Sequence, residues 1–113
     1  MILPSRGEVW LADLDPTHGR EQAGKRPVLV ISTNDFNHGP AELAVVLPIT
    51  TKKKGVPWHV AVSPPEGGLK SKSYIRCEDI RSLSRARLTK RFGVVSQATA
   101  AAVEDRLRIL IEL

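Results

Sequence analysis

Three arginines lie where they could bind a phosphate group. Arg26 stands directly before a proline and the apolar run 28–31. Because proline fixes its own φ and pushes the residue before it towards extended geometry, Arg26 should leave its loop with a constrained backbone at the start of a strand. Arg20 lies in the same loop, and Arg76 lies in the alternating stretch SYIRCE. A guanidinium donates two parallel hydrogen bonds to phosphate and stays protonated, which suits it to phosphate binding; for any one of the three, a surface ion pair is the commoner role.

Cleavage of RNA suits such cations, because RNA carries its own nucleophile, the 2′-hydroxyl. A protein can promote this reaction by binding the scissile phosphate, stabilising the added negative charge and moving protons around the 2′-hydroxyl. Thr50 and Thr51 close an apolar stretch just before three lysines, so a threonine hydroxyl could bond the phosphate there. Threonine at a strand end is otherwise unremarkable.

The proton acceptor should be a carboxylate, because arginine is a poor base. Glu21 in the loop and Glu78 near Arg76 are the two candidates. Glu78 follows Arg76 by two residues, which predicts that both side chains share one face of a strand. The sheet would then fix Glu78, whereas Glu21 lies among flexible glycine positions. We therefore place the base on Glu78, for which a cross-strand salt bridge is the alternative.

Neither a metal nor a cofactor is expected. His18, His38 and His59 occur singly, without the spacing of ligands, and we interpret each as a loop or surface residue. The single cysteine, Cys77, excludes an internal disulfide and a cysteine-only zinc site, and we expect its side chain to face the core.

The composition is that of one globular domain with an uneven charge. The chain has 113 residues, 42% hydrophobic and 26% charged, so a single domain over residues 1–113 is expected. Residues 50–91 hold eleven Lys or Arg against three Asp or Glu, and the remainder holds six against nine. This clustering predicts a surface that attracts polyanions; a solubilising face is the alternative. With no apolar run of roughly 18 residues and no signal peptide, a cytoplasmic protein without a membrane segment is predicted.

Seven short segments, apolar or alternating, recur between turns rich in proline and glycine. They predict strands at residues 9–14, 28–32, 43–49, 59–62, 73–77, 81–83 and 92–95. Pro48 argues for an edge or a bulge in the third of them. Ser96 can cap a C-terminal helix, because apolar residues recur on one helical face after it. The fold class is thus mainly β with helices (α+β), a small barrel or sandwich covered by a C-terminal helix.

Three ordered stretches resemble one known family over nearly the whole chain. The opening RGEVWLADLDPTHGREQAGKRPVLVIS is similar to an RGE-[IV]-[WY] start and a G-x-E-Q-x-G-x-R-P loop, with Arg26 and Pro27 in register. VVLPITTKKKG resembles a strand that ends in threonine or serine, here Thr50. YIRCEDIRSLSRARL resembles a later strand and its [IL]-R-[ST]-[IL] turn. The family is the MazF/PemK-type toxins of toxin–antitoxin pairs, which are small ribosome-independent endoribonucleases.

The resemblance implies roles for individual residues. Arg26 would bind and polarise the scissile phosphate, and Thr50 would assist it. In the Kid-like branch an arginine and an aspartate on the later strand, with a histidine in the first loop, carry the acid–base chemistry. Arg76 matches that arginine, whereas Glu78 replaces the aspartate and Arg20 replaces the histidine.

The resemblance also implies an activity, a fold and partners. The family cleaves single-stranded mRNA at selected sequences without a metal and leaves a 2′,3′-cyclic phosphate and a 5′-hydroxyl. Its fold is a single SH3-like β-barrel, here of about seven short strands, with a C-terminal α-helix. Members are homodimers, and an antitoxin with an acidic C-terminal segment inhibits them. The residues expected to contact RNA are Arg20, Gln22, Lys25, Lys52, Lys53, Lys54, Trp58 and Arg81.

Two other functions would use the same basic surface. A non-catalytic SH3-like module could bind nucleic acid or protein through it. A gyrase poison of the CcdB type shares the toxin fold but depends on a Trp-Gly-Ile C-terminus, whereas this chain ends in Ile-Glu-Leu. The combination of Arg26, Thr50 and Arg76 favours the nuclease.

Overall fold

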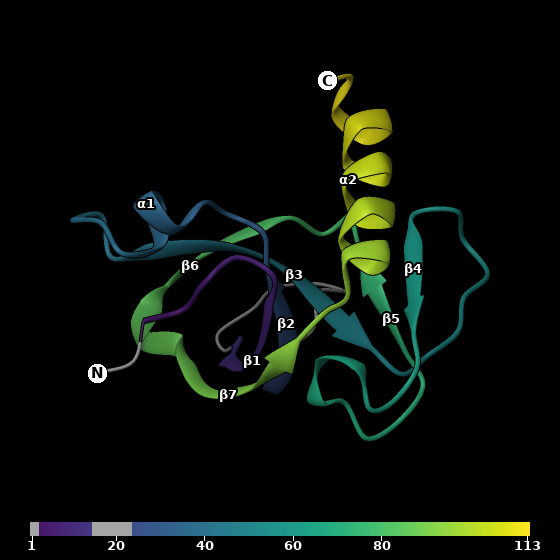
Figure 1. Ribbon diagram of the computed structural model, residues 1–113, viewed down its shortest axis with the longest axis horizontal. Coiled ribbons are helices and arrows are strands. Elements are labelled where there is room, and N and C mark those ends of the chain that lie inside the picture. Colours follow the sequence, from purple (N-terminus) through teal and green to yellow (C-terminus); the bar gives the residue numbers. More distant parts are fainter. Residues whose placement is uncertain (1–2, 15–23) are drawn as a thin grey trace.

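The computed structural model describes residues 3–14 and 24–113, and Figure 1 shows their arrangement. The strands in this part of the chain are β1 (Glu8–Asp13), β2 (Lys25–Val30), β3 (Leu43–Thr50), β4 (His59–Val62), β5 (Ser73–Arg76), β6 (Arg81–Ser84) and β7 (Leu88–Val94). The helices are α1 (Asn34–Asn37) and α2 (Gln97–Ile111), with two 3-10 turns, η1 (Glu66–Gly68) and η2 (Arg85–Arg87). The predicted class, mainly β with a C-terminal helix, is confirmed.

The seven strands form one antiparallel sheet in the order β4-β5-β3-β2-β1-β7, with β6 also paired to β3. The central strand, β3, pairs with β2 on one side. On the other side it pairs with β6 as far as Val46 and with β5 from Ile49 onwards. Pro48, which lacks an N–H, falls where β3 changes partner. β3 is therefore not an edge strand, and the sheet accommodates the proline at an interruption of the ladder.

Both faces of β2 and β3 are buried, which explains the unbroken apolar runs in their sequences. Successive side chains of a strand point to opposite faces. One core cluster contains Leu29 and Leu47 together with Val103 of α2. The cluster on the other face contains Val28 and Trp10. The two central strands are thus packed from both sides. This packing fixes the backbone from which the side chains at the strand ends project.

The C-terminal helix α2 begins at the predicted cap. The Ser96 hydroxyl accepts a hydrogen bond from Thr99 N at 3.1 Å, and a carboxylate oxygen of Glu66 in η1 accepts one from Ser96 N at 2.9 Å. Burial would raise the pKa of Glu66, but hydrogen bonds from Thr99 and Ser96 lower it below its usual value. Val103 of this helix is buried, and the C-terminal half of the helix extends away from the strands (Figure 1). The predicted helix is therefore confirmed, with its start fixed from η1.

Several elements of the described chain differ from the prediction, among them β2, which begins at Lys25 instead of residue 28. β7 begins at Leu88 instead of residue 92, because β1 pairs with the stretch LTKR, whose charged side chains give no apolar pattern. The sequence pattern does not predict α1, which Thr33 caps by accepting a hydrogen bond from Phe36 N. β5 ends at Arg76, one residue early. Among the described helices, none has the length and apolar character needed to cross a membrane.

Candidate nucleic-acid groove

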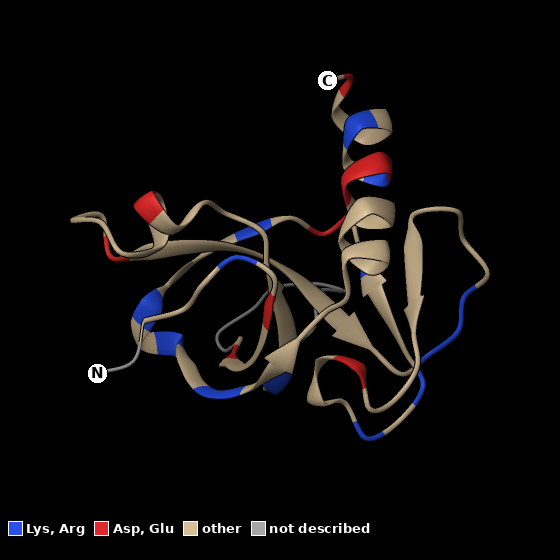
Figure 2. Ribbon diagram, viewed as in Figure 1, with Lys and Arg blue, Asp and Glu red and all other residues tan. Residues whose placement is uncertain are grey.

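A groove of about 530 Å³ opens at the ends of β2, β3 and β5. Its lining residues are Lys25, Arg26, Pro27, Ile49, Thr50, Thr51, Lys52, Lys54, Ser73 and Arg76. Half of them are cations, and no carboxylate belongs to the lining within residues 3–14 and 24–113. Such a surface concentrates anions. Figure 2 shows the same charge along the loop that joins β3 to β4, which carries the run Lys52 to Lys54.

Sheet register brings three of the predicted residues to this groove. β2 and β3 are antiparallel with Val28 opposite Pro48, and continuing that register by two residues places Arg26 beside Thr50. Thr50 pairs in turn with Tyr74 of β5, and Arg76 follows two residues later on the same face. Arg26 and Arg76 therefore flank β3 from its two neighbouring strands, with Thr50 between them.

Arg26 is exposed at the mouth of β2. Its backbone pairs with Ala12 of β1, and the following residue, Pro27, pairs with Leu11. The Arg26 guanidinium donates a long hydrogen bond, 3.4 Å, to the carbonyl of Lys25. The strand thus fixes the backbone, as the Arg-Pro pair predicts, while the charged end of the side chain stays accessible.

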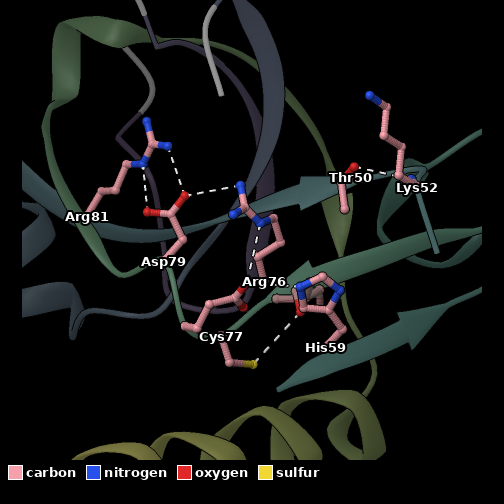
Figure 3. A network of polar contacts seen from close by, with 9 residues as sticks. Thr50, Lys52, His59, Arg76, Cys77, Asp79 and Arg81 are labelled. Carbon is pink, nitrogen blue, oxygen red and sulfur yellow. Dashed lines mark hydrogen bonds and ion pairs between the residues drawn. The ribbon is translucent and has the colours of Figure 1, made fainter. Parts of the chain in front are cut away.

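Arg76 is held by carboxylates (Figure 3). Its Nε lies 3.5 Å from Glu78 Oε2 and its Nη1 lies 3.3 Å from Asp79 Oδ2, and the side chain is 22% exposed. Two nitrogens of Arg81 donate hydrogen bonds to the Asp79 carboxylate, at 2.8 and 3.1 Å. The result is a connected set of charges that orients the Arg76 guanidinium before any ligand arrives.

Glu78 lies beyond the end of β5 and not on the strand as expected. β5 ends at Arg76, and a turn closed by the hydrogen bond from Asp79 N to Arg76 O at 3.2 Å carries Glu78 away from the alternation of the strand. The prediction that Glu78 belongs to this strand is wrong, because the strand ends at Arg76. Glu78 nevertheless contacts Arg76, and it also lies 3.0 Å from Nε2 of His59.

Of the histidines, His59 contradicts the expected loop or surface position. It is the first residue of β4, and its side chain is 4% exposed. The alternation of residues 59–62 predicts a strand there but not the contact between the His59 ring and Glu78. His38 is exposed, and its Nε2 lies 2.8 Å from the carbonyl of Pro4. His18 lies outside the described residues.

The remaining predicted RNA contacts fall into three groups. Lys25, Lys52 and Lys54 line the groove, and Lys52 N donates to Thr50 Oγ1 at 3.1 Å (Figure 3). Lys53 is exposed beside them, whereas Trp58, which is half-buried, and Arg81 are not among the lining residues. Arg20, Glu21 and Gln22 lie outside the described residues.

A second groove, of about 500 Å³, adjoins the first over Pro27, Thr51 and Ser73. Lys70, Lys90 and Arg91 lie along it, between apolar residues. Sequence reasoning did not single out these three, although the basic excess over residues 50–91 covers them. η1 approaches β7 closely here: a Cβ at Gly68, where φ is +68°, would lie 2.1 Å from the carbonyl oxygen of Phe92, so glycine is required.

Cys77 faces the core, as expected. Its side chain is fully buried, and its N–H donates to the carbonyl of Trp58 at 3.3 Å. Burial, together with the negative charge of Glu78, raises the pKa of the Cys77 thiol to about 11. Within the described chain, no three His, Cys, Asp or Glu side chains gather as a metal site would require.

The fold and the groove together define a small antiparallel β protein with a cationic groove between strand ends. Residues 5–111 match the family described as PemK-like, MazF-like toxin of type II toxin-antitoxin system. The chain belongs to this family, and the predicted resemblance is confirmed.

Several known proteins are similar over their full length. Endoribonuclease EndoA of Bacillus subtilis is 35% identical over 99% of this chain and 97% of its own. Endoribonuclease MazF9 of Mycobacterium tuberculosis is 34% identical over 96% of each chain. The crystal structure of MazF from Deinococcus radiodurans superposes with a TM-score of 0.88 at 26% identity and full coverage of both chains. An endoribonuclease from a mycobacterial species, solved in complex with its cognate antitoxin, has a TM-score of 0.82 at 27% identity and covers 97% of this chain and 96% of its own.

Proposed function

We propose that this chain is an endoribonuclease toxin that cleaves single-stranded mRNA at selected sequences without a metal ion. The observation that carries the proposal is the meeting of Arg26, Thr50 and Arg76 at one cationic groove. The relatives named endoribonucleases, which match over nearly the full length, support it. A groove of this charge attracts a polyanion, and donors on packed strands can stabilise charge that develops on a phosphate.

The reaction that suits this groove is a transesterification within RNA. The 2′-oxygen bonds to the adjacent phosphorus, the bond from phosphorus to the 5′-oxygen breaks, and a 2′,3′-cyclic phosphate and a 5′-hydroxyl result. The 2′-hydroxyl proton passes to a base, and the leaving 5′-oxygen takes a proton from an acid. Arg26 and Thr50 would bind the non-bridging phosphate oxygens, and Arg76 would neutralise charge from the other side of β3.

Glu78 is the proposed base. Glu78 and Asp79 both contact Arg76, but two nitrogens of Arg81 also engage Asp79. Glu78→Gln should abolish the acidic limb of the pH–rate profile, because that limb reports deprotonation of the essential carboxylate, and Glu21→Gln should leave it in place. A Glu78→Gln variant that keeps both its rate and its acidic limb would reduce Glu78 to a salt-bridge residue.

An antitoxin with an acidic C-terminal segment is the proposed protein partner. Related structures of this fold contain a cognate antitoxin or are MazE–MazF complexes. The basic excess over residues 50–91 supplies the complementary charge. Charge reversal of Lys52 and Lys54 should weaken inhibition of RNA cleavage by such a segment. Unchanged inhibition in the charge-reversed variant would contradict docking of the antitoxin on this basic surface.

The proposal also includes a homodimer, which would act in the cytoplasm, where mRNA is found. It further includes closure of the sheet into an SH3-like barrel. The exposed apolar side chains Val94, Ile109 and Ile111 favour a covered surface on or near α2. Light scattering at micromolar concentration should give the mass of two chains, and a monomer would contradict the dimer.

The deciding experiment incubates the purified protein with a long RNA in excess EDTA. We expect discrete fragments whose 5′ ends are hydroxyls and whose 3′ ends carry cyclic phosphate, with Arg26→Ala as the inactive control. Fragments with 5′-phosphate, or activity that EDTA abolishes, would contradict the mechanism. RNA that is bound but never cut would favour the non-catalytic binding module.

A further inference from the structure

His59 is a buried histidine to which the proposed reaction gives no role. It opens β4, its side chain is 4% exposed, and it pairs in register with Arg76 of β5. Registered residues of an antiparallel pair project from the same face of the sheet. His59 therefore lies on the face that carries Arg76, one of the cations that line the groove.

One carboxylate oxygen joins His59 to Arg76 (Figure 3). Oε2 of Glu78 lies 3.0 Å from His59 Nε2 and 3.5 Å from Arg76 Nε. A carboxylate accepts hydrogen bonds, so Nε2 carries the hydrogen and donates it. Because both contacts use Oε2, the second oxygen, Oε1, is the one left to take up a proton.

The other ring nitrogen restricts what His59 can do. Nδ1 is buried and has no hydrogen-bond partner in the described part of the chain. A buried donor without a partner costs about 1–3 kcal/mol, so a hydrogen on Nδ1 is unfavourable in this site. The ring is therefore suited to one task, a fixed donor directed at Glu78.

We propose that His59 is a positioning residue for RNA cleavage, which acts by holding Oε2 of Glu78 and thereby orienting both Glu78 and Arg76. The inference rests on the proposed endoribonuclease activity. His59 is not among the groove-lining residues, so it acts through Glu78 and Arg76 and not on RNA. Without this donor, Glu78, whose side chain is already 31% exposed, is free to turn towards water, and Arg76 loses a carboxylate that orients it.

Three substitutions of His59 test the donor. His59→Leu removes it, His59→Asn has an amide too short to reach Oε2, and His59→Gln places an amide N–H near the position of Nε2. We expect kcat to fall about tenfold in the first two variants with KM changed less than about twofold, since positioning acts in the transition state. His59→Gln should recover kcat to within about threefold of the wild type.

A double-mutant cycle separates positioning from a general structural role. His59→Leu added to Glu78→Gln should lower kcat no further than Glu78→Gln alone, because His59 acts through Glu78. His38→Leu is the matched control: it removes a histidine whose Nε2 contacts the Pro4 carbonyl at 2.8 Å, and it should leave kcat unchanged. Circular dichroism melts accompany every variant, and His59→Asn and His59→Gln carry the comparison if His59→Leu does not fold.

The outcomes distinguish this inference from the function on which it rests. Normal kcat in the folded His59 variants, or losses that add in the cycle, would overturn the positioning role and leave the nuclease intact. Failure of the wild-type protein to cleave RNA would instead remove the proposed function itself.

Discussion

Arg26 and Arg76 both line the groove, but the first is exposed and the second is held by ion pairs. Arg26 is exposed at the start of β2, where its guanidinium makes a 3.4 Å hydrogen bond to the neighbouring carbonyl. Arg76 is 22% exposed and lies within 3.5 Å of Glu78 and within 3.3 Å of Asp79. Arg26 can give most of its donors to a phosphate but must lose side-chain entropy to do so. Arg76 is already ordered, at the cost of sharing its charge with two acids.

This contrast predicts the largest effect for Arg26→Ala. Cleavage should fall by about a hundredfold or more, the scale of losing a donor to the negative charge that develops on the phosphate. The melting temperature should hardly change, because the exposed side chain stabilises little. Single-turnover cleavage of a defined RNA and a thermal melt measure the two quantities. Near-normal rates would remove Arg26 from the site.

Arg76→Ala should cost less activity and more stability. We expect a loss of about thirtyfold in rate, because part of its charge is neutralised before RNA binds. Unfolding should become easier by about 1 kcal/mol, because Glu78 and Asp79 are left as neighbouring like charges. Urea titrations of both arginine variants provide the comparison. Equal stability of Arg26→Ala and Arg76→Ala would show that the carboxylates do not brace Arg76 energetically.

Thr50→Ala tests the position between the two arginines. Thr50 Oγ1 accepts from Lys52 N at 3.1 Å, so its own hydrogen remains available for a phosphate oxygen. We expect about a tenfold loss of rate, the scale of one hydrogen bond to a charged group. Thr50→Ser keeps the hydroxyl and should recover most of the rate. Similar losses for serine and alanine would assign Thr50 a packing role.

The smallest effect is expected in the second groove. Lys70→Ala with Lys90→Ala should weaken binding of long RNA about three- to fivefold and flatten its salt dependence, because each lysine that contacts a phosphate releases counterions. Lys72→Ala is the control, since Lys72 is exposed and does not line either groove. Fluorescence anisotropy at several salt concentrations gives both numbers. An effect of Lys72→Ala equal to that of the pair would show that Lys70 and Lys90 act only through the net charge of the protein.

The sequence predicted the features that depend on local chemistry. Arg26 next to Pro27 identified a strand mouth, and Ser96 before an apolar periodicity identified the start of α2. Short apolar or alternating segments between turn residues indicated where each of the seven strands lies, although not all of their bounds. These signals lie within a few residues of the features that they predict.

What the sequence could not provide depends on contacts between distant residues. His59 has only its alternation as a signal, and its partner Glu78 is 19 residues away in a turn. The polar pattern of residues 88–91 did not predict a strand, yet β1 pairs with them. Pro48 suggested an edge, whereas β3 is central and changes its partner at that residue. In each case the register of a sheet, which no single segment encodes, decides the outcome.

The buried thiol of Cys77 can report local opening of β4 and β5, the strand pair that bears Arg76. With a pKa of about 11, roughly one thiol in ten thousand is ionised at neutral pH. Alkylating reagents attack the thiolate, so they must wait until the chain opens and Cys77 meets water. Cys77 is the only cysteine in the chain, and labelling can be followed by mass without an engineered probe. Its rate under native conditions therefore reports how readily the edge formed by β4 and β5 comes apart.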